Sequence, residues 1–116
     1  MKIRIKGNSL RYRLSKSDVE RFTSVGYLEE ATNFGNQQLI YALQRGGHKG
    51  LEATFNDNKI TVTMPATMVA EWEQPNKVGF DGQDNKLALL IEKDFQCLDN
   101  VAEDQSDNYP NPAGVC

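Results

Sequence analysis

"IRIKGNSLRYRLSKSDVERF", residues 3–22, aligns without a gap with "ATFNDNKITVTMPATMVAEW", residues 53–72. Few residues are identical, but the apolar positions and the turn positions coincide. They include Ile5 with Phe55, Asn8 with Asn58, Leu10 with Ile60, and Phe22 with Trp72. Because similarity at a fixed spacing is strong evidence for a repeated structural unit, the sequence predicts two copies, over about 1–46 and 51–96.

Two β-hairpins are expected in each copy. Apolar residues at alternating positions are typical of half-buried strands, and glycine, asparagine and aspartate tolerate the positive φ of two-residue turns. The predicted turns are Gly7-Asn8, Gly35-Asn36, Asp57-Asn58 and Asp84-Asn85. The strands of the closing hairpins are predicted near 27–34 with 37–45, and near 77–83 with 86–95.

A helix is expected between the two hairpins of each copy, over about 16–25 and 66–74. Ser15 fits the N-cap of the first helix, and Asp18 three residues later completes a capping box. Pro65 fits the first turn of the second helix. Apolar residues three positions apart give each helix one face for the core.

We therefore predict an α+β fold built from a duplicated ββαββ unit. Its eight mainly antiparallel strands would form a barrel-like or strongly curved sheet with two helices, which would remove exposed strand edges. An open sheet with both helices on one face is the alternative. Residues 1–98 are predicted to form a single domain, and residues 99–116 an extended, acidic C-terminal tail that is ordered only where it docks.

The composition is that of a globular protein, with 39% hydrophobic and 25% charged residues. No apolar run reaches the roughly 18 residues that a membrane span needs, and the N-terminus lacks the apolar segment of a signal peptide. We expect a cytoplasmic protein, in which Cys97 and Cys116 are free thiols.

The net charge of −3 conceals a strong asymmetry along the chain. Residues 1–21 contain seven basic and two acidic side chains, whereas residues 94–116 contain five acidic side chains and no basic one. Five of the bases belong to the first hairpin: Lys2, Arg4, Lys6, Arg11 and Arg13. This asymmetry makes the first hairpin the candidate anion-binding surface.

A two-residue turn at Gly7-Asn8 fixes how these bases pair. Arg4 then lies opposite Arg11, and Lys2 opposite Arg13, on the face away from the apolar pairs. Like charges directly opposite each other destabilise a sheet. The equivalent positions of the second copy hold threonine and glutamate, so the fold itself does not require a basic face here.

Four arrangements could offset the repulsion, and the sequence leaves all of them open. The long side chains could splay apart in solvent. The acidic tail could dock on the face, with Tyr109 and Val115 as apolar anchors. An acid on a neighbouring strand, such as Glu29, could pair with the bases. An external anion could bind, because arginine suits phosphate and carboxylate.

Glu30 and Tyr41 form a secondary candidate site. They are expected to face each other in the first closing hairpin, whereas in the second closing hairpin Phe80 is expected to face Leu89 on an apolar face. A half-buried carboxylate has a raised pKa unless it is paired, and such groups are functional candidates. Alternatively, a register shift or a bulge turns Glu30 outward.

Motifs of familiar catalytic and metal sites are absent from the sequence. His48, the only histidine, lies in the glycine-rich linker "RGGHKG" (45–50). The two cysteines have no metal-ligand spacing, and there is no phosphate-binding loop or nucleophile motif. We predict no metal and no cofactor, and assign no catalytic residue. The basic face lacks an aromatic side chain for stacking, which argues against a nucleic-acid partner.

The opening "MKIRIKGNSLRYRLSKSDV", the segment "LIEKDFQCL" and the closing "EDQSDNYPNP" before the terminal cysteine resemble a family of small uncharacterised bacterial proteins. The resemblance covers the whole chain. It implies a bacterial cytoplasmic protein and supplies no mechanism and no site residues.

The leading functional hypothesis is a small binding or interaction module rather than an enzyme, with the basic hairpin facing an anionic ligand or the protein's own acidic tail. One alternative is an enzyme acting on a phosphorylated small molecule, with Glu30, or Glu92 and Asp94, as acid–base groups or metal ligands. Another is a structural oligomeric protein. The oligomeric state is not determined by the sequence.

Overall fold

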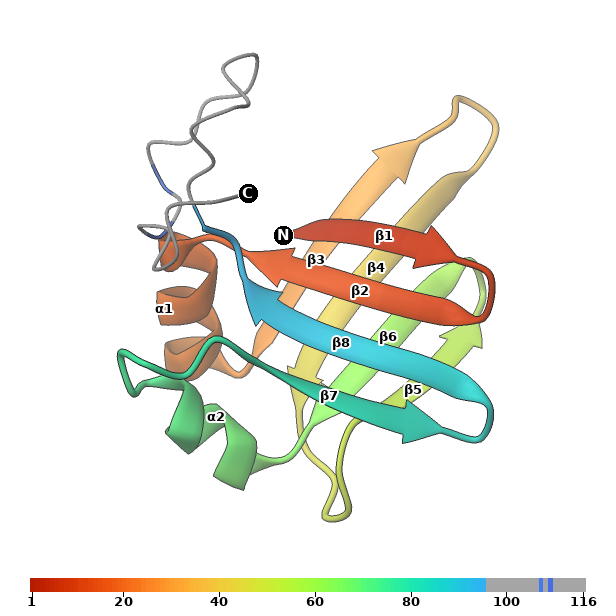
Figure 1. Cartoon of the computed structure of the whole chain (residues 1–116). Coiled ribbons are helices and arrows are strands. Elements are labelled where there is room, and N and C mark those ends of the chain that lie inside the picture. The colour runs from red at the N-terminus through yellow and green to blue at the C-terminus, as the bar shows by residue number, and fades with distance from the viewer. Residues whose placement is uncertain (96–106, 108, 110–116) are drawn as a thin grey trace.

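The computed structural model describes residues 1–95, 107 and 109 (Figure 1). The order β-β-α-β-β occurs twice along the described chain. The elements are β1 (Lys2–Lys6), β2 (Ser9–Leu14), α1 (Lys16–Val25), β3 (Tyr27–Asn33), β4 (Gln38–Arg45), β5 (Glu52–Asn56), β6 (Lys59–Met64), α2 (Ala66–Trp72), β7 (Gly79–Asp84) and β8 (Leu87–Lys93).

The strands form two four-stranded sheets, in the orders β1-β2-β8-β7 and β3-β4-β6-β5. Each sheet therefore contains one hairpin from the first half of the chain and one from the second. The central pairs, β2 with β8 and β4 with β6, are parallel, and the four hairpin pairs are antiparallel. Figure 1 shows the two sheets in separate layers whose strands cross at an angle.

The predicted α+β class, with eight mainly antiparallel strands and two helices, is confirmed. The barrel-like sheet is wrong, because the strands divide into two layers that do not join into one sheet. Each helix follows a strand of one sheet and precedes a strand of the other. The chain thus changes layers at each helix. Each central strand, β2 or β4, pairs with a central strand from the second half of the chain, β8 or β6.

Three of the four hairpin turns lie where the sequence predicts them. Gly7, Asp57 and Asn58 adopt positive φ angles of 55°, 51° and 63°. The fourth turn is displaced by one residue to Asn85-Lys86, because Asn85 takes the positive φ of 56°.

This displacement changes the expected pairing in the last hairpin. Phe80 lies opposite Ile91, and not opposite Leu89 as predicted. Asp84 remains in β7, where its carboxylate accepts a hydrogen bond of 2.9 Å from the Ala53 backbone N–H. Asp84, which was predicted to lie in the turn, thus forms the hydrogen bond that joins β7 to β5.

The helices match their predicted positions closely. Ser15 caps α1 and forms the expected capping box with Asp18, and Gly26 ends the helix with a φ of 83°. Pro65 is the N-cap residue of α2, just before the first turn, and α2 ends two residues earlier than expected. Among the described helices, neither is long and apolar enough to cross a membrane.

One core fills the space between the sheets and the helices. Tyr12 and Leu14 from one sheet and Leu43 and Val62 from the other are fully buried. Figure 1 shows α1 and α2 side by side at one end of the two sheets. There the ring of Trp72 packs edge-on against the ring of Phe22 from α1, at a centroid distance of 6.4 Å. It packs in the same way against the ring of Phe80 from β7, at 6.0 Å.

The two parallel pairs differ in register by two residues. Ser9 pairs with Ala88, so the fifty-residue offset would pair Lys59 with Gln38, but Lys59 pairs with Ile40. A shift of two residues keeps every side chain on its face. It moves the tip of the β3–β4 hairpin outward, and Figure 1 shows this hairpin extending beyond β1.

Trp72→Ala should reduce the free energy of unfolding by about 3–5 kcal/mol, because it removes the largest fully buried side chain and leaves a cavity. Urea denaturation followed by circular dichroism would measure the loss. Phe34→Ala is the matched control, since Phe34 is 67% exposed and should lose less than about 0.5 kcal/mol. Equal losses in the two variants would contradict the described core.

Candidate functional site

Five basic side chains lie on the outer face of the β1-β2-β8-β7 sheet. We call Lys2, Arg4, Lys6, Arg11 and Arg13 the basic face. The predicted register is confirmed, with Arg4 opposite Arg11 and Lys2 opposite Arg13. The alternate residues of β2 point inward and are buried. The like-charge pairs expected from the sequence therefore exist in the fold.

Acidic residues at the end of β8 offset part of this repulsion. The parallel register places Glu92 beside Arg13. The Glu92 Oε1 atom lies 2.9 Å from the Nε of Arg13 and 3.5 Å from the Nε of Arg11. The Lys2 Nζ lies 2.9 Å from the Oδ2 of Asp94, which is a buried residue. Glu92 on β8 and Asp94 directly after it thus supply acidic partners for three of the five bases.

The neighbouring acid suggested by the sequence, Glu29, is the wrong one. It lies on β3, in the other sheet, where its carboxylate accepts a 2.8 Å hydrogen bond from the Tyr27 hydroxyl. Its oxygen lies 3.9 Å from the Lys59 Nζ. Glu29 therefore belongs to a separate surface cluster.

Arg4 and Lys6 differ from the other three bases. Both are exposed, and neither has an ion-pair partner among residues 1–95, 107 and 109. The row of the sheet that contains Arg4 continues through Arg11 and Leu90 to Asp81. Strands lie about 4.8 Å apart, so Asp81 is separated from Arg11 by the whole width of β8. Among the described residues, the end of the basic face nearest the Gly7 turn therefore has no acidic partner.

The two described residues of the tail contact α1 and the end of β8. The Asp107 carboxylate accepts a 2.6 Å hydrogen bond from the Ser17 hydroxyl, and its carbonyl accepts one from the Lys16 N–H. Hydrogen bonds from Ser17 and Ser15 lower the pKa of Asp107. The Tyr109 ring packs 5.7 Å from that of Phe95.

Tyr109 lies beside the start of α1, where its backbone N–H donates to the Asp94 carbonyl at 2.8 Å. Its predicted role as an anchor of the tail on the basic face stays a prediction. The other predicted anchor, Val115, lies outside the described residues, as do the two cysteines. Tyr109 also lies against Lys93, whose Nζ is 5.0 Å from the ring centroid.

The secondary candidates, Glu30 and Tyr41, face each other in the predicted register. No register shift occurs, yet Glu30 is exposed. Its Oε1 lies 3.4 Å from the Met1 amino nitrogen, which is also 2.7 Å from the Oδ2 of Asp18. Burial raises the pKa of Tyr41, and its hydroxyl donates to the Met1 carbonyl. These residues hold the start of β1 in place.

The acids considered for catalysis do not form one cluster. Glu30 contacts the Met1 amine on one sheet, whereas Glu92 and Asp94 contact basic side chains on the other. His48 is exposed in the linker between β4 and β5. Within the part of the chain that the structure describes, no three histidine, cysteine or acidic residues group as metal ligands would.

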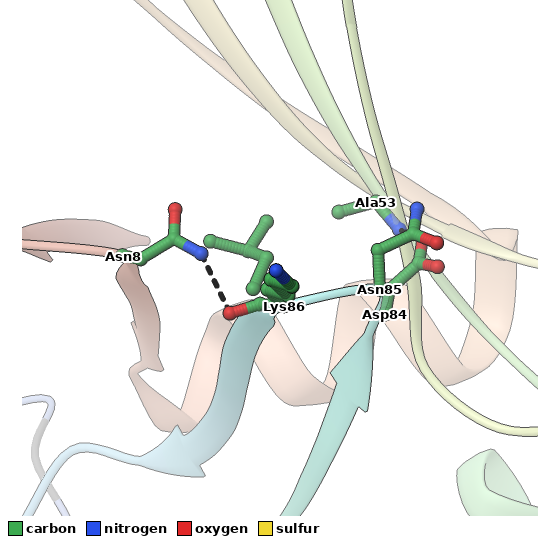
Figure 2. A pocket seen from close by; sticks show the side chains of 6 residues that line it. Asn8, Ala53, Asp84, Asn85 and Lys86 are labelled. Atoms are coloured by element: carbon green, nitrogen blue, oxygen red, sulfur yellow. Dashed lines mark hydrogen bonds between the residues drawn. The ribbon is translucent and has the colours of Figure 1, made fainter.

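Sequence reasoning missed two adjoining hollows at the end of the molecule opposite the helices. One has a volume of about 470 Å³ and is mainly apolar, with Ile5, Leu10, Leu39, Phe55, Ile60 and Leu87 among its lining residues. The other, of about 650 Å³, shares Asn8, Ala53 and Leu87 with it. Figure 2 shows the Asn8 amide donating to the Lys86 carbonyl in the second hollow, at 2.6 Å.

These hollows combine residues from both halves of the chain. Ile5 and Phe55, which occupy equivalent positions in the two hairpins, line the same apolar hollow and are 59% and 65% exposed. The only signal in the sequence was an apolar residue two positions before each turn. Only the pairing of strands between the two halves of the chain shows that Ile5 and Phe55 line the same hollow.

A buried lysine also lies outside the sequence prediction. Lys93 is only 6% exposed and donates to the Gln74 carbonyl at 3.3 Å. Burial lowers its pKa. Because Tyr109 covers it and it lines neither hollow, we interpret Lys93 as a structural residue.

Comparison with known proteins identifies one family that the chain matches. Residues 1–113 match DUF7009, a family of unknown function. The chain belongs to this family. No curated protein and no solved structure matches the chain. The match agrees with the resemblance to an uncharacterised family and leaves function to be argued from the geometry.

Glu92→Gln should lower the free energy of unfolding by about 1–2 kcal/mol, because Arg11 and Arg13 lose their shared carboxylate and repel their neighbours. Urea denaturation at low salt would measure the loss. The control Glu29→Gln removes a longer, exposed ion pair and should cost less than about 0.5 kcal/mol. A Glu92→Gln loss no larger than the control would contradict the assigned role of β8.

Lys93→Met should stabilise the protein at neutral pH. Burial lowers the pKa of Lys93 in the folded state, so the unfolded chain holds this proton more tightly and wild-type stability rises as pH increases through that range. The advantage of the variant should therefore shrink between pH 7 and about pH 10.5, the ordinary lysine pKa. Thermal unfolding across this range would test it. An advantage that does not change with pH would refute a buried, charged Lys93.

Proposed function

We propose that the protein is a non-enzymatic binding module whose basic face takes an anionic partner. The observation that carries the proposal is the uncompensated pair of Arg4 and Lys6. Three bases of the same face have acidic partners on β8 or directly after it, whereas these two have none among the described residues.

The second opening hairpin supports this interpretation as an internal comparison. It has the same turn length and the same register, but Thr54 lies opposite Thr61 and Glu52 opposite Thr63. An outer face without like-charge pairs is thus compatible with this hairpin. The second hairpin forms without an arginine pair, so the pairing of Arg4 with Arg11 is not needed to form this hairpin.

The arrangement suits an anion with extended or repeated charge. Opposite residues of a hairpin lie about 5 Å apart, so the guanidinium groups of Arg4 and Arg11 can reach one anionic group together. Arginine binds carboxylate and phosphate oxygens through paired hydrogen bonds. Lys6, next along β1 on the same face, adds a third charge. Bound anion would also remove the repulsion, and so would stabilise the fold.

The proposal extends to two features that the sequence analysis predicted. We propose that the two ββαββ halves arose by duplication, which the equivalent order of elements supports. The basic face would then be a feature that only one copy acquired or kept. We also propose that the module works in the cytoplasm.

Heparin serves as a general polyanion probe for the test. The full chain should be retained on a heparin column at low salt, and Arg4→Gln/Lys6→Gln should elute at clearly lower salt, because each lost contact reduces the salt dependence of binding. The control Arg21→Gln/Lys49→Gln removes the same two charges from exposed positions on α1 and the linker. It should elute like the wild type.

Two results would overturn the proposal. One is failure of the wild type to bind heparin at low salt. The other is equal weakening in both double variants, which would mean that net charge and not the basic face controls retention. Circular dichroism should show that all variants remain folded, since the four side chains are exposed.

A further inference from the structure

We infer that the anionic partner is an extended peptide, alternating acidic and apolar residues, that adds as a strand to the free edge of β1. This inference rests on the proposed function and names its partner. Strand addition to an exposed sheet edge is a common mode of peptide binding, in which backbone hydrogen bonds give affinity and alternate side chains give specificity.

Within the part of the chain that the structure describes, no strand pairs with the outer edge of β1, and we call this edge free in that sense. β1 is the terminal strand of the order β1-β2-β8-β7. In a hairpin with a two-residue turn, the residues that close the turn, here Lys6 and Ser9, exchange backbone hydrogen bonds. The bonding residues of β1 are therefore Lys2, Arg4 and Lys6. The N–H and C=O groups of Ile3 and Ile5 point away from β2, toward the open edge.

The other edges of the sheets are less available to a basic-face partner. β5 and β7 lie against each other at one seam, where Asp84 accepts a hydrogen bond from the Ala53 N–H. β3 carries Glu29 and Glu30, which would repel an acidic strand. The start of β1 is held by contacts of the Met1 amine with Asp18 and Glu30, so the free stretch is Ile3 to Ile5.

The side chains of β1 define the chemistry of the partner. Outward-facing Lys2, Arg4 and Lys6 would lie about 5 Å from the outward side chains of an added strand. Opposite charges in such pairs stabilise a sheet, and like charges destabilise it. The outward residues of the partner should therefore be acidic. A second copy of β1 is disfavoured because it would place lysine and arginine against lysine and arginine.

The inward side chains of the partner would meet an apolar surface. Ile5 is 59% exposed and lines the apolar hollow together with Leu39 and Phe55. Figure 1 shows the β3–β4 hairpin, which carries Leu39, extending past β1. A strand added to β1 would lie over this extension, with its inward residues continuing the row of Ile3 and Ile5. The partner should therefore alternate apolar residues with its acidic ones.

The test uses two fluorescent peptides of about seven residues, the length of a typical strand. In one, glutamate alternates with valine. The other has the same composition, with its glutamates and valines in separate blocks. Fluorescence polarisation should show about tenfold tighter binding of the alternating peptide, because only this peptide presents acids to one face and valines to the other.

Hydrogen exchange distinguishes strand addition from binding to the face alone. The alternating peptide should slow the exchange of the Ile3 and Ile5 amides, whereas heparin should leave them unchanged. Ile5→Pro removes one outward N–H without breaking a bond to β2, and proline is tolerated on edge strands. It should weaken peptide binding about tenfold relative to Ile5→Val and leave heparin retention intact.

A charge-reversal experiment completes the design. Arg4→Glu/Lys6→Glu should lose the glutamate peptide and gain a peptide in which lysine alternates with valine, whereas Arg21→Glu/Lys49→Glu should keep the wild-type preference. Light scattering would reveal a second copy as the occupant of the edge, which would overturn the inference.

The failure of the inference is distinguishable from failure of the proposed function. If heparin is retained through Arg4 and Lys6 but the two glutamate peptides bind equally, or the Ile3 and Ile5 amides stay unprotected, the strand inference is wrong and the anion-binding face stands. If neither heparin nor peptide binds, both are wrong.

Discussion

Parallel pairing between the two halves of the chain is the constraint on which the rest of the structure depends. β2 pairs with β8, and β4 pairs with β6, so each sheet is assembled from hairpins that are distant in sequence. The helices carry the chain from one layer to the other and cover one end of the core. The same pairing brings Glu92 beside Arg13 and places Ile5 and Phe55 in one hollow. Charge compensation and the open end of the molecule are both consequences of this exchange.

On the basic face, repulsion between paired basic side chains is only partly offset by acidic partners. Glu92 and Asp94 pair with the bases at the end of the hairpin near the helices, where the sheet joins the core. Within residues 1–95, 107 and 109, no acidic side chain pairs with Arg4 or Lys6, which lie near the turn. Charged side chains on an edge strand also discourage uncontrolled strand pairing. A charged edge of this kind disfavours like-charged strands, and this is the property on which the proposed choice of an acidic partner rests.

Short-range features were predictable because neighbouring residues decide them. Gly7 and the Asp57-Asn58 pair fix their turns through positive φ, and the turn length then fixes the register that sets Arg4 against Arg11. Ser15 and Asp18 cap α1 as expected. The one turn that was misplaced had two suitable residues in succession, and Asp84 was retained in β7 by a contact with Ala53. That contact joins strands of different sheets, so local sequence could not reveal it.

The sequence by itself determined the ββαββ order, the register of three hairpins and the concentration of five bases on one face. These depend on turn chemistry and side-chain alternation, which act over a few residues. Only the tertiary structure decided that the strands form two layers, that β8 and the residue after it, and not β3, supply the compensating acids, and that Arg4 and Lys6 have no acidic partner among the described residues. The physical reason is that a central strand can pair with any strand of suitable face and length. The choice among partners is made by burying a common core, to which residues from both halves contribute together.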